Sequence, residues 1–150
     1  YYTLSWTERF FDQIWHDWYP ARNDNRHKLT VNATHRFNGK FDMYMQWNYH
    51  TGDRTTIPTQ IIDGILYYSN PYNHKLPDYH RLDIGFNFRK TTRRGNESIW
   101  NLSIYNAYCR MNPLFAMVST TIREDKVEDY KFVTLGVLPI IPTFSYTLKF

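Results

Sequence analysis

The chain has 150 residues, of which 42% are hydrophobic and 19% aromatic, and its net charge is +4 at neutral pH. No apolar run approaches the roughly 18 residues that a membrane-spanning helix needs, so a helical membrane protein is excluded. The basic residues are interspersed with acidic ones and the aromatic residues fall on every predicted strand, which argues against nucleic acid as a partner.

The aromatic residues give the chain a composition typical of a boundary between water and an apolar phase. There are thirteen Tyr, ten Phe and five Trp, and rings with a polar tip favour such boundaries. The single Cys109 cannot form an internal disulfide bond. Because no signal peptide opens the sequence, we expect either a mature chain or the tail of a larger protein.

Six segments alternate apolar and polar residues with a period of two, and no segment of comparable length shows a helical stripe. In chain order they are residues 2–10, 27–37, 41–49, 79–89, a fifth that begins near 98, and 130–150. The third segment, for example, places Phe41, Met43, Met45, Trp47 and Tyr49 on one face. The predicted fold class is therefore all-β.

The connections between these segments alternate between short and long. Asn38-Gly39-Lys40 predicts a tight hairpin turn, and residues 93–96 predict a second short turn. The other three connections have about fifteen to thirty residues, which is unusual within a compact soluble domain. Outer-membrane barrels combine short periplasmic turns with long extracellular loops. This order predicts antiparallel strands of a membrane barrel whose C-terminus is periplasmic.

The strand lengths fit the same interpretation. Residues 41–49 extend over about 26 Å, or about 20 Å of membrane depth at a tilt near 40°, against an apolar band of about 25 Å. A soluble sandwich would show the same alternation, but sandwich cores favour Val, Ile and Leu over large rings. Rings are expected at both edges of the band: Phe37, Phe41, Phe88, Trp100 and Phe150 at the periplasmic edge, and Trp6, Trp47, Tyr49 and Tyr79 at the extracellular edge.

The last segment contains Pro139 and Pro142, which suggest a turn. A reversal there would put the C-terminus on the wrong side of the membrane, so residues 130–150 are interpreted as one long strand, irregular at its prolines. Six strands are too few to close a membrane barrel, and open edges in lipid would leave backbone groups unpaired. We therefore expect residues 1–150 to be the C-terminal part of a larger barrel.

Four stretches resemble the C-terminal end of TonB-dependent outer-membrane receptors, of the kind abundant in Bacteroidetes. The resemblance implies the last six antiparallel strands of a transmembrane β-barrel of about 22 strands, with a plug domain and earlier strands that are absent from this chain. The stretches are LSWTERF at 4–10 with WYPARNDNRH at 18–27, LPDYHRLD at 76–83, NLSIYNAY at 101–108 with Arg110 and Asn112-Pro113, and IIPTFSYTLKF at 140–150.

The same resemblance implies a location in the outer membrane and active uptake of a nutrient such as a glycan or a siderophore. The partners that it implies are outer-membrane lipid, the rest of the barrel with its plug, TonB through the absent N-terminal part, and the barrel-assembly machinery. A surface lipoprotein is a further candidate partner. The alternative function is a passive porin or an adhesin barrel without TonB coupling, and an upstream plug domain would decide between the two.

The resemblance also implies that the barrel-assembly machinery recognises the last strand through Tyr146, Leu148 and Phe150. An edge strand with free backbone groups can add to the open seam of the assembly barrel. The same residues would also face lipid.

The long connections carry rings beside hydrogen-bonding side chains, which suits a glycan or another polar nutrient. Packing within the loops is the alternative role for each ring. The candidate ligand-binding residues are Trp15, Trp18, Tyr19 and Arg22 in the first long connection, with Tyr72 and His74 in the second.

Polar residues of the strands form a further group, which we expect to face the plug. Within it, Arg36 could pair with Asp42 across one hairpin. The group is Arg36, Asp42, Tyr44, Gln46, Asn48, Asp83, Asn87 and Arg89.

No Gly-x-Ser-x-Gly, glycine-rich phosphate loop or His-Glu-x-x-His motif is present, so no enzyme and no cofactor are predicted. The histidines lack the spacing of metal ligands, so no metal is predicted.

Overall fold

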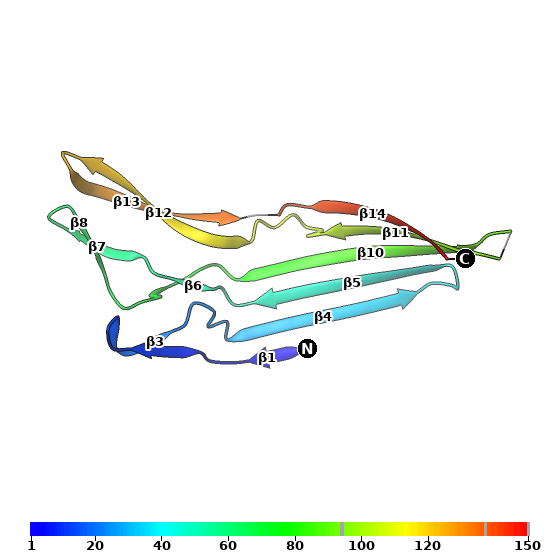
Figure 1. Ribbon diagram of the computed structural model, residues 1–150, viewed down its shortest axis with the longest axis horizontal. Helices are drawn as coiled ribbons and strands as arrows, with labels where there is room; N and C mark the ends of the chain where they lie inside the picture. Colours follow the sequence, from blue (N-terminus) through cyan, green and yellow to red (C-terminus); the bar gives the residue numbers. More distant parts are fainter. Residues whose placement is uncertain (94, 137, 150) are drawn as a thin grey trace.

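The computed structural model describes residues 1–93, 95–136 and 138–149, and these residues form strands and irregular segments without a helix. Six strands make one antiparallel sheet (Figure 1). The predicted all-β class is confirmed, and each predicted segment contributes a strand to this main sheet. In spatial order the sheet contains β1 (Tyr2–Leu4), β4 (His27–Arg36), β5 (Phe41–His50), β10 (Tyr79–Thr91), β11 (Glu97–Tyr105) and β14 (Ile141–Lys149).

The connections of the main sheet alternate as predicted. The short connections β4–β5 and β10–β11 lie at one end, here the short-turn end, which is also where β14 ends (Figure 1). The long connections β1–β4, β5–β10 and β11–β14 lie at the opposite, long-loop end. Asn38 stabilises the first short turn, because its Oδ1 accepts hydrogen bonds from the Lys40 and Phe41 amides at 2.8 and 2.9 Å.

The long connections contain hairpins of their own, which the sequence did not predict. Figure 1 shows them extending beyond the main sheet. The second and third connections touch at their tips, where the Val127 amide donates to the Gly64 carbonyl at 3.1 Å. The paired strands are β2 (Glu8–Phe11) with β3 (Trp15–Pro20), β6 (Arg54–Thr55) with β9 (His74–Lys75), β7 (Pro58–Ile62) with β8 (Ile65–Tyr68), and β12 (Pro113–Arg123) with β13 (Lys126–Gly136).

The strand register aligns most apolar residues of the main sheet into one continuous face, here the apolar face. One row across it contains Ala33, Met45, Ile84, Ile104 and Pro142, each paired with the next. Side chains alternate between faces along a strand, so a one-residue slip would break every such row. The face is made by Tyr2, Leu4, Leu29, Val31, Ala33, Phe41, Met43, Met45, Trp47, Tyr49, Leu82, Ile84, Phe86, Phe88, Trp100, Leu102, Ile104, Pro142, Phe144, Tyr146 and Leu148.

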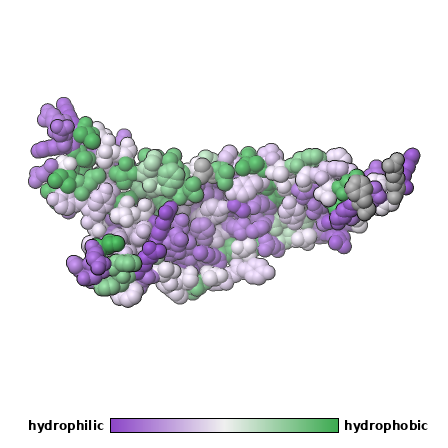
Figure 2. Space-filling model, in the orientation of Figure 1, coloured by the Kyte–Doolittle hydropathy of each residue, from purple (hydrophilic) through white to green (hydrophobic). Residues whose placement is uncertain are grey.

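The opposite, polar face carries all eight residues that were expected to face a plug. One of its rows contains Arg36, Asp42, Asn87, Asn101 and Ser145. Asn101 Nδ2 donates to Asn87 Oδ1 at 2.7 Å, so hydrogen bonds link the strands across this face. In Figure 2, hydrophilic residues gather over the middle of the molecule, beside hydrophobic ones along the edge formed by β12, β13 and β14.

The apolar face is uncovered in the part of the chain that the structure describes. Its side chains stay open, with exposed fractions of 61% for Phe144, 47% for Trp100 and 42% for Val31. The buried apolar side chains all lie in the long connections, and they are Tyr19, Ala21, Pro58 and Leu76. The main sheet therefore lacks a hydrophobic core of its own among these residues. The described residues include no helix that is long and apolar enough to cross a membrane.

The interpretation of residues 130–150 as one strand was wrong. The described chain forms β13, which pairs with β12, and then β14, which pairs with β11. Both strands nevertheless run toward the short-turn end (Figure 1), so the chain does not reverse at the prolines. The alternation of residues did not reveal that the two parts belong to different sheets.

Three other expectations needed correction. The segment 2–10 is divided between β1 of the main sheet and β2 of the first hairpin. Tyr79 was expected at the outer edge of the apolar band, yet it pairs in register with His50 on the polar face. Asp42 forms its ion pair with Arg89 of β10, at 3.0 Å, instead of with Arg36. The guanidinium that pairs with Asp42 thus comes from β10, on the other side of β5 from Arg36.

Candidate functional site at the long-loop end

A pocket of about 270 Å³ opens on the polar face at the long-loop end. His50 of β5, Tyr79 and Arg81 of β10, and Tyr105 of β11 line it from three adjacent strands. The alternation of side chains along each strand brings these four residues to one face. The rest of the lining comes from the long connections: Asp53, Asn106, Asn112, Pro113, Leu114 and Leu138.

Two rings form a stacked pair in this pocket. The His50 and Tyr79 rings have centroids 4.6 Å apart and planes 7° apart. The Tyr79 hydroxyl accepts a hydrogen bond from Arg81 Nη1 at 3.0 Å, which fixes the position of the ring. Cross-strand ring pairs of this kind stabilise a sheet and present a flat surface to a ligand.

The charge of Arg81 is neutralised within the site. Its Nε and Nη2 donate to Asp83 Oδ2 at 3.0 and 2.8 Å, while Nη1 also donates to the Tyr105 hydroxyl at 2.7 Å. The other charged residue of the lining, Asp53, accepts a hydrogen bond from Asn25 Nδ2 at 2.6 Å. The described lining thus offers rings, neutral hydrogen-bonding groups and the Asp53 carboxylate, without an unpaired positive charge for an anion.

Asn106 holds the third long connection over the pocket. It is 1% exposed, and its Nδ2 donates to the carbonyls of Arg110 and Leu138, both at 2.9 Å. The backbone amide of Asn106 donates to Asp83 Oδ1 at 3.0 Å, so the Asp83 carboxylate binds both Arg81 and this loop. Asn106 has a φ of 53°, a left-handed conformation that Asn tolerates better than most residues.

A second asparagine fastens the same connection to the start of β10. Asn112 Oδ1 accepts a hydrogen bond from the His80 amide at 3.1 Å, and its Nδ2 donates to the His80 carbonyl at 2.9 Å. Arg110 Nη2 adds a hydrogen bond to the Asp78 carbonyl at 2.9 Å. These contacts replace the missing strand partner of this part of β10 with side chains.

Asp78 joins the second long connection to the rim. Its carboxylate accepts hydrogen bonds from the Gly52 amide at 2.9 Å and the Tyr49 hydroxyl at 2.8 Å, and it pairs with Lys75 at 2.9 Å. Burial by itself would raise the pKa of Asp78, but these three partners stabilise the carboxylate and lower its pKa to about 2. The rim of the pocket is therefore anchored by a charge at neutral pH.

Asp24 has the equivalent place before β4. Its side chain is 2% exposed and lies 3.5 Å from both Arg26 Nε and Arg54 Nε. The Thr7 amide donates to its Oδ1 at 3.1 Å. The sequence Asp24-Asn25-Arg26-His27 is similar to Asp78-Tyr79-His80-Arg81. Both stretches have a structural role, since each carboxylate ties a loop to the beginning of a strand.

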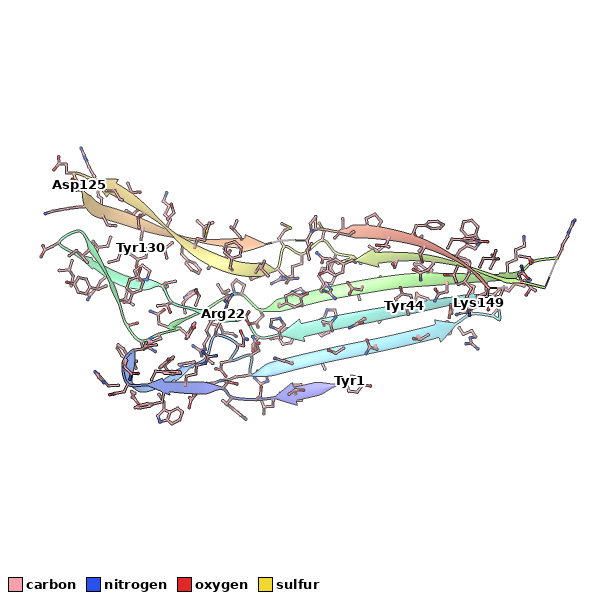
Figure 3. All side chains as sticks on the ribbon, viewed as in Figure 1. Tyr1, Arg22, Tyr44, Asp125, Tyr130 and Lys149 are labelled. Atoms are coloured by element: carbon pink, nitrogen blue, oxygen red, sulfur yellow. The ribbon has the colours of Figure 1, made fainter. Side chains whose placement is uncertain are left out.

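The six predicted ligand-binding residues are spread over the loops. Tyr19 and Tyr72 come together as a stacked pair with centroids 6.3 Å apart, but Tyr19 is 3% exposed and packs inside. Arg22 and Tyr72 share the lining of a second pocket of about 350 Å³, with Arg54 and Phe115 among its other residues. Figure 3 shows Arg22 where the main sheet meets the loops.

The remaining predicted residues do not line either pocket. Trp15 and Trp18 lie on β3 and are 37% and 64% exposed. Trp18 packs on Phe10 with ring centroids 5.7 Å apart, and His74 meets Phe132 edge-on at 4.9 Å. Stacking within the loops therefore accounts for several of the rings that were predicted to bind ligand.

The predicted assembly residues are partly described. Tyr146 and Leu148 lie on the apolar face of β14, where Tyr146 is the register partner of Trp100 and Leu148 that of Ser98. Phe150 lies outside the described residues.

The histidines near the long-loop end each contact a different group and do not form a cluster. His27 contacts the Tyr2 hydroxyl at 2.8 Å, His80 contacts the Tyr108 hydroxyl at 2.7 Å, and His50 contacts the Thr51 carbonyl at 2.9 Å. No group of three or more His, Cys, Asp or Glu residues that could hold a metal ion occurs in the described ranges.

Sequence reasoning missed the residues that build the main pocket, namely His50, Tyr79, Tyr105 and Asn106. The alternation of β5 and β10 already put His50 and Tyr79 on the polar face, and this signal could have been used. Nothing local in the sequence indicated that Asn106 would be buried. No family model matches the chain, and no curated protein or solved structure shows significant similarity to it.

Proposed function

We propose that this chain is the C-terminal part of the β-barrel of a TonB-dependent outer-membrane receptor that takes up a nutrient. The observation that carries the proposal is the continuous and uncovered apolar face of the main sheet. The resemblance of the sequence to such receptors supports the more specific statement about TonB. The alternative is a passive porin or an adhesin with the same kind of barrel.

Lipid is the natural cover for the apolar face. Burying a large apolar side chain is worth about 1.5–3 kcal/mol, and the face contains Trp100, Phe144 and Tyr146, all 47–61% exposed. A soluble domain would cover such a face with a second layer, and the described residues supply none. In a membrane, acyl chains would take that place while the polar face meets water or protein.

The free edges of the sheet support a larger barrel. β1 and β14 each have one neighbour within the described sheet, so one edge of each strand has no backbone partner there. In lipid, every such group would cost several kcal/mol unless it were hydrogen-bonded. We infer that further strands of the same barrel pair with β1 and β14, and that the seam forms at β14.

The pocket at the long-loop end suits a neutral polar ligand. The His50–Tyr79 stack would bind the apolar face of a sugar ring, and the surrounding amides and hydroxyls would bind its hydroxyl groups. The engagement of Arg81 by Asp83 makes an anionic siderophore the poorer candidate of the two nutrients. The exposed Trp18 on the first hairpin is a second place where a sugar could stack.

The proposal includes the partners that such a receptor requires. These are the missing barrel strands and plug, TonB, outer-membrane lipid, and the barrel-assembly machinery acting through Tyr146, Leu148 and Phe150. A surface lipoprotein is a further candidate partner. The long-loop end would face the medium and the short-turn end the periplasm.

The test uses the complete protein that contains this chain, expressed in a Gram-negative host. We expect it in the outer-membrane fraction, soluble only with detergent, and with an electrophoretic mobility that changes on heating as a closed barrel unfolds. A protein that remains folded and monomeric in water without detergent would contradict the membrane proposal.

A second experiment separates an active receptor from a passive barrel. Uptake of a labelled oligosaccharide is measured in cells with and without TonB. Uptake that stops without TonB supports the receptor, whereas uptake that is unchanged supports the porin.

A further inference from the structure

Charged residues are distributed unequally between the two faces of the main sheet. Its six strands contain nine Asp, Glu, Lys and Arg residues, and every one except Lys90 lies on the polar face. Lys90 is the register partner of Ser98 and follows Phe88 on the apolar face. The other eight are Lys28, Arg36, Asp42, Arg81, Asp83, Arg89, Glu97 and Lys149.

A second lysine lies beside Lys90 at the short-turn end. Lys40 belongs to the turn between β4 and β5, and its carbonyl accepts a hydrogen bond from the Arg89 amide at 2.7 Å. This bond fixes the turn against β10. Lys40, Lys90, Phe41 and Phe88 all line one surface hollow of about 670 Å³.

Phe41 and Phe88 form the apolar wall of this hollow, and Phe37 extends their stack by packing on Phe41. Phe37 and Phe41 have centroids 4.9 Å apart and planes 16° apart, and Phe41 and Phe88 have centroids 4.6 Å apart and planes 20° apart. Phe37 and Phe88 are 52% and 48% exposed. The edges of these stacked rings thus form an apolar strip that continues along the apolar face.

The acidic residues nearby do not neutralise the two lysines. Asp42 pairs with Arg89 at 3.0 Å and Glu97 pairs with Lys149 at 3.5 Å, both on the opposite face. Within the described ranges, neither Lys40 nor Lys90 forms a side-chain ion pair. Lys90 therefore places one ammonium group at the end of the aromatic strip, on a face whose strands carry no acidic residue. Lys40 brings a second ammonium group to the same hollow from the adjacent turn.

This combination fits a lipid with a phosphate group at one end and acyl chains at the other. Lysine side chains lie along apolar surface while their charge reaches the membrane–water boundary, and each contributes about five-fold to binding at an anionic surface. Aromatic rings at the same boundary pack against the acyl chains. We propose that the hollow binds the headgroup of a negatively charged glycerophospholipid, with its chains along the phenylalanine strip. This inference rests on the membrane location proposed above.

The test measures lipid binding to the complete protein by native mass spectrometry in detergent. The probes are phosphatidylglycerol and phosphatidylcholine with identical acyl chains. The double variant Lys40→Gln, Lys90→Gln removes the two charges. The matched control Lys126→Gln, Lys131→Gln removes two lysines from β13 at the other end of the molecule.

We expect the wild-type protein to retain phosphatidylglycerol more strongly than phosphatidylcholine. The Lys40, Lys90 variant should lose about 25-fold in apparent affinity for phosphatidylglycerol, whereas the control should change less than about two-fold. Equal retention in the two variants would overturn the proposal, as would complete displacement of the lipid by millimolar inorganic phosphate, because that would indicate a phosphate site.

Failure of this inference is distinguishable from failure of the proposed function. If the protein inserts into vesicles of both lipids but does not discriminate between them, the lipid site is wrong and the membrane barrel stands. If the protein inserts into neither, the membrane barrel itself is wrong and the lipid site falls with it.

Discussion

The ring of Tyr44 on β5 occupies the space that a side chain at Gly85 of β10 would need. The two residues are register partners in the middle of the polar face, and a β-carbon added at Gly85 would overlap three atoms of the Tyr44 ring and hydroxyl. Tyr44, labelled in Figure 3, thus covers the bare backbone of its partner, an arrangement that compensates for the weak strand propensity of glycine.

We expect Gly85→Ala to destabilise the protein by about 1–3 kcal/mol, because the methyl group must displace the Tyr44 ring. Chemical unfolding in detergent measures the change. The control is Gly39→Ala, where no atom lies within 4 Å of the added carbon, and it should change stability by less than about 0.5 kcal/mol. Equal effects of the two substitutions would refute this explanation, and adding Tyr44→Ala to Gly85→Ala should recover part of the loss.

Asn106 provides the second prediction. Asn106→Gly removes the hydrogen bonds to Arg110 and Leu138 but keeps the backbone conformation, so we expect a loss of about 2–3 kcal/mol. Asn106→Ala should cost about 1–2 kcal/mol more, because alanine disfavours the left-handed conformation. Limited proteolysis of the β12–β13 hairpin and thermal unfolding both report the loss. A fully stable Asn106→Gly protein would show that the side chain does not hold the loop.

The low pKa of Asp78 predicts a pH dependence. Its pKa is 3.8 in the unfolded reference state and about 2 in the fold, so its contribution to stability is complete above the unfolded pKa and is lost as the pH falls toward the folded pKa. We expect Asp78→Asn to lower the melting temperature at neutral pH, and the difference from wild type to shrink between about pH 4 and pH 2.

The control for Asp78 is Asp125→Asn at the exposed tip of the β12–β13 hairpin (Figure 3). It should change neither the melting temperature nor its pH dependence. A difference between Asp78→Asn and wild type that stays constant through the acidic range would disprove the electrostatic explanation.

Ligand binding at the first hairpin can be examined through its tryptophans. Trp18 is 64% exposed, so Trp18→Ala should fold normally and weaken oligosaccharide binding by about three- to ten-fold, while Trp15→Ala has a smaller effect. Trp18→Phe keeps a stacking ring and should retain most of the affinity. Calorimetry with an oligosaccharide that the complete protein binds measures the change, and an unchanged affinity in Trp18→Ala would leave the ring with its packing role against Phe10.

The proposed assembly signal can be tested at Phe150. Deletion of Phe150 from the complete protein should reduce the heat-modifiable barrel in the outer membrane several-fold, because the assembly machinery would lose one residue of its recognition pattern. Phe115→Ala removes an exposed ring from β12, outside the main sheet, and should leave the amount of barrel unchanged. Normal barrel levels after deletion of Phe150 would exclude it from the assembly signal.

The sequence alone predicted the six segments that supply strands to the main sheet and, except for Tyr79, the face of the residues assigned to them. Alternation is a local property of an extended chain. The alternate residues from Phe41 to Tyr49 could therefore be assigned to one face without knowledge of any neighbouring strand. The lengths of the connections likewise indicated which ends of the strands lie together. Both predictions depended on residues that are close in the chain.

Only the tertiary structure decided which residues meet across strands and loops. Asp42 binds Arg89 and not Arg36 because the register with β10 brings that guanidinium to 3.0 Å. The site around Arg81 and Asn106 needs contributions from three strands and a loop that folds back over them, with Leu138 32 residues away from Asn106. Such contacts depend on strand register and loop closure, which the period of the sequence does not encode.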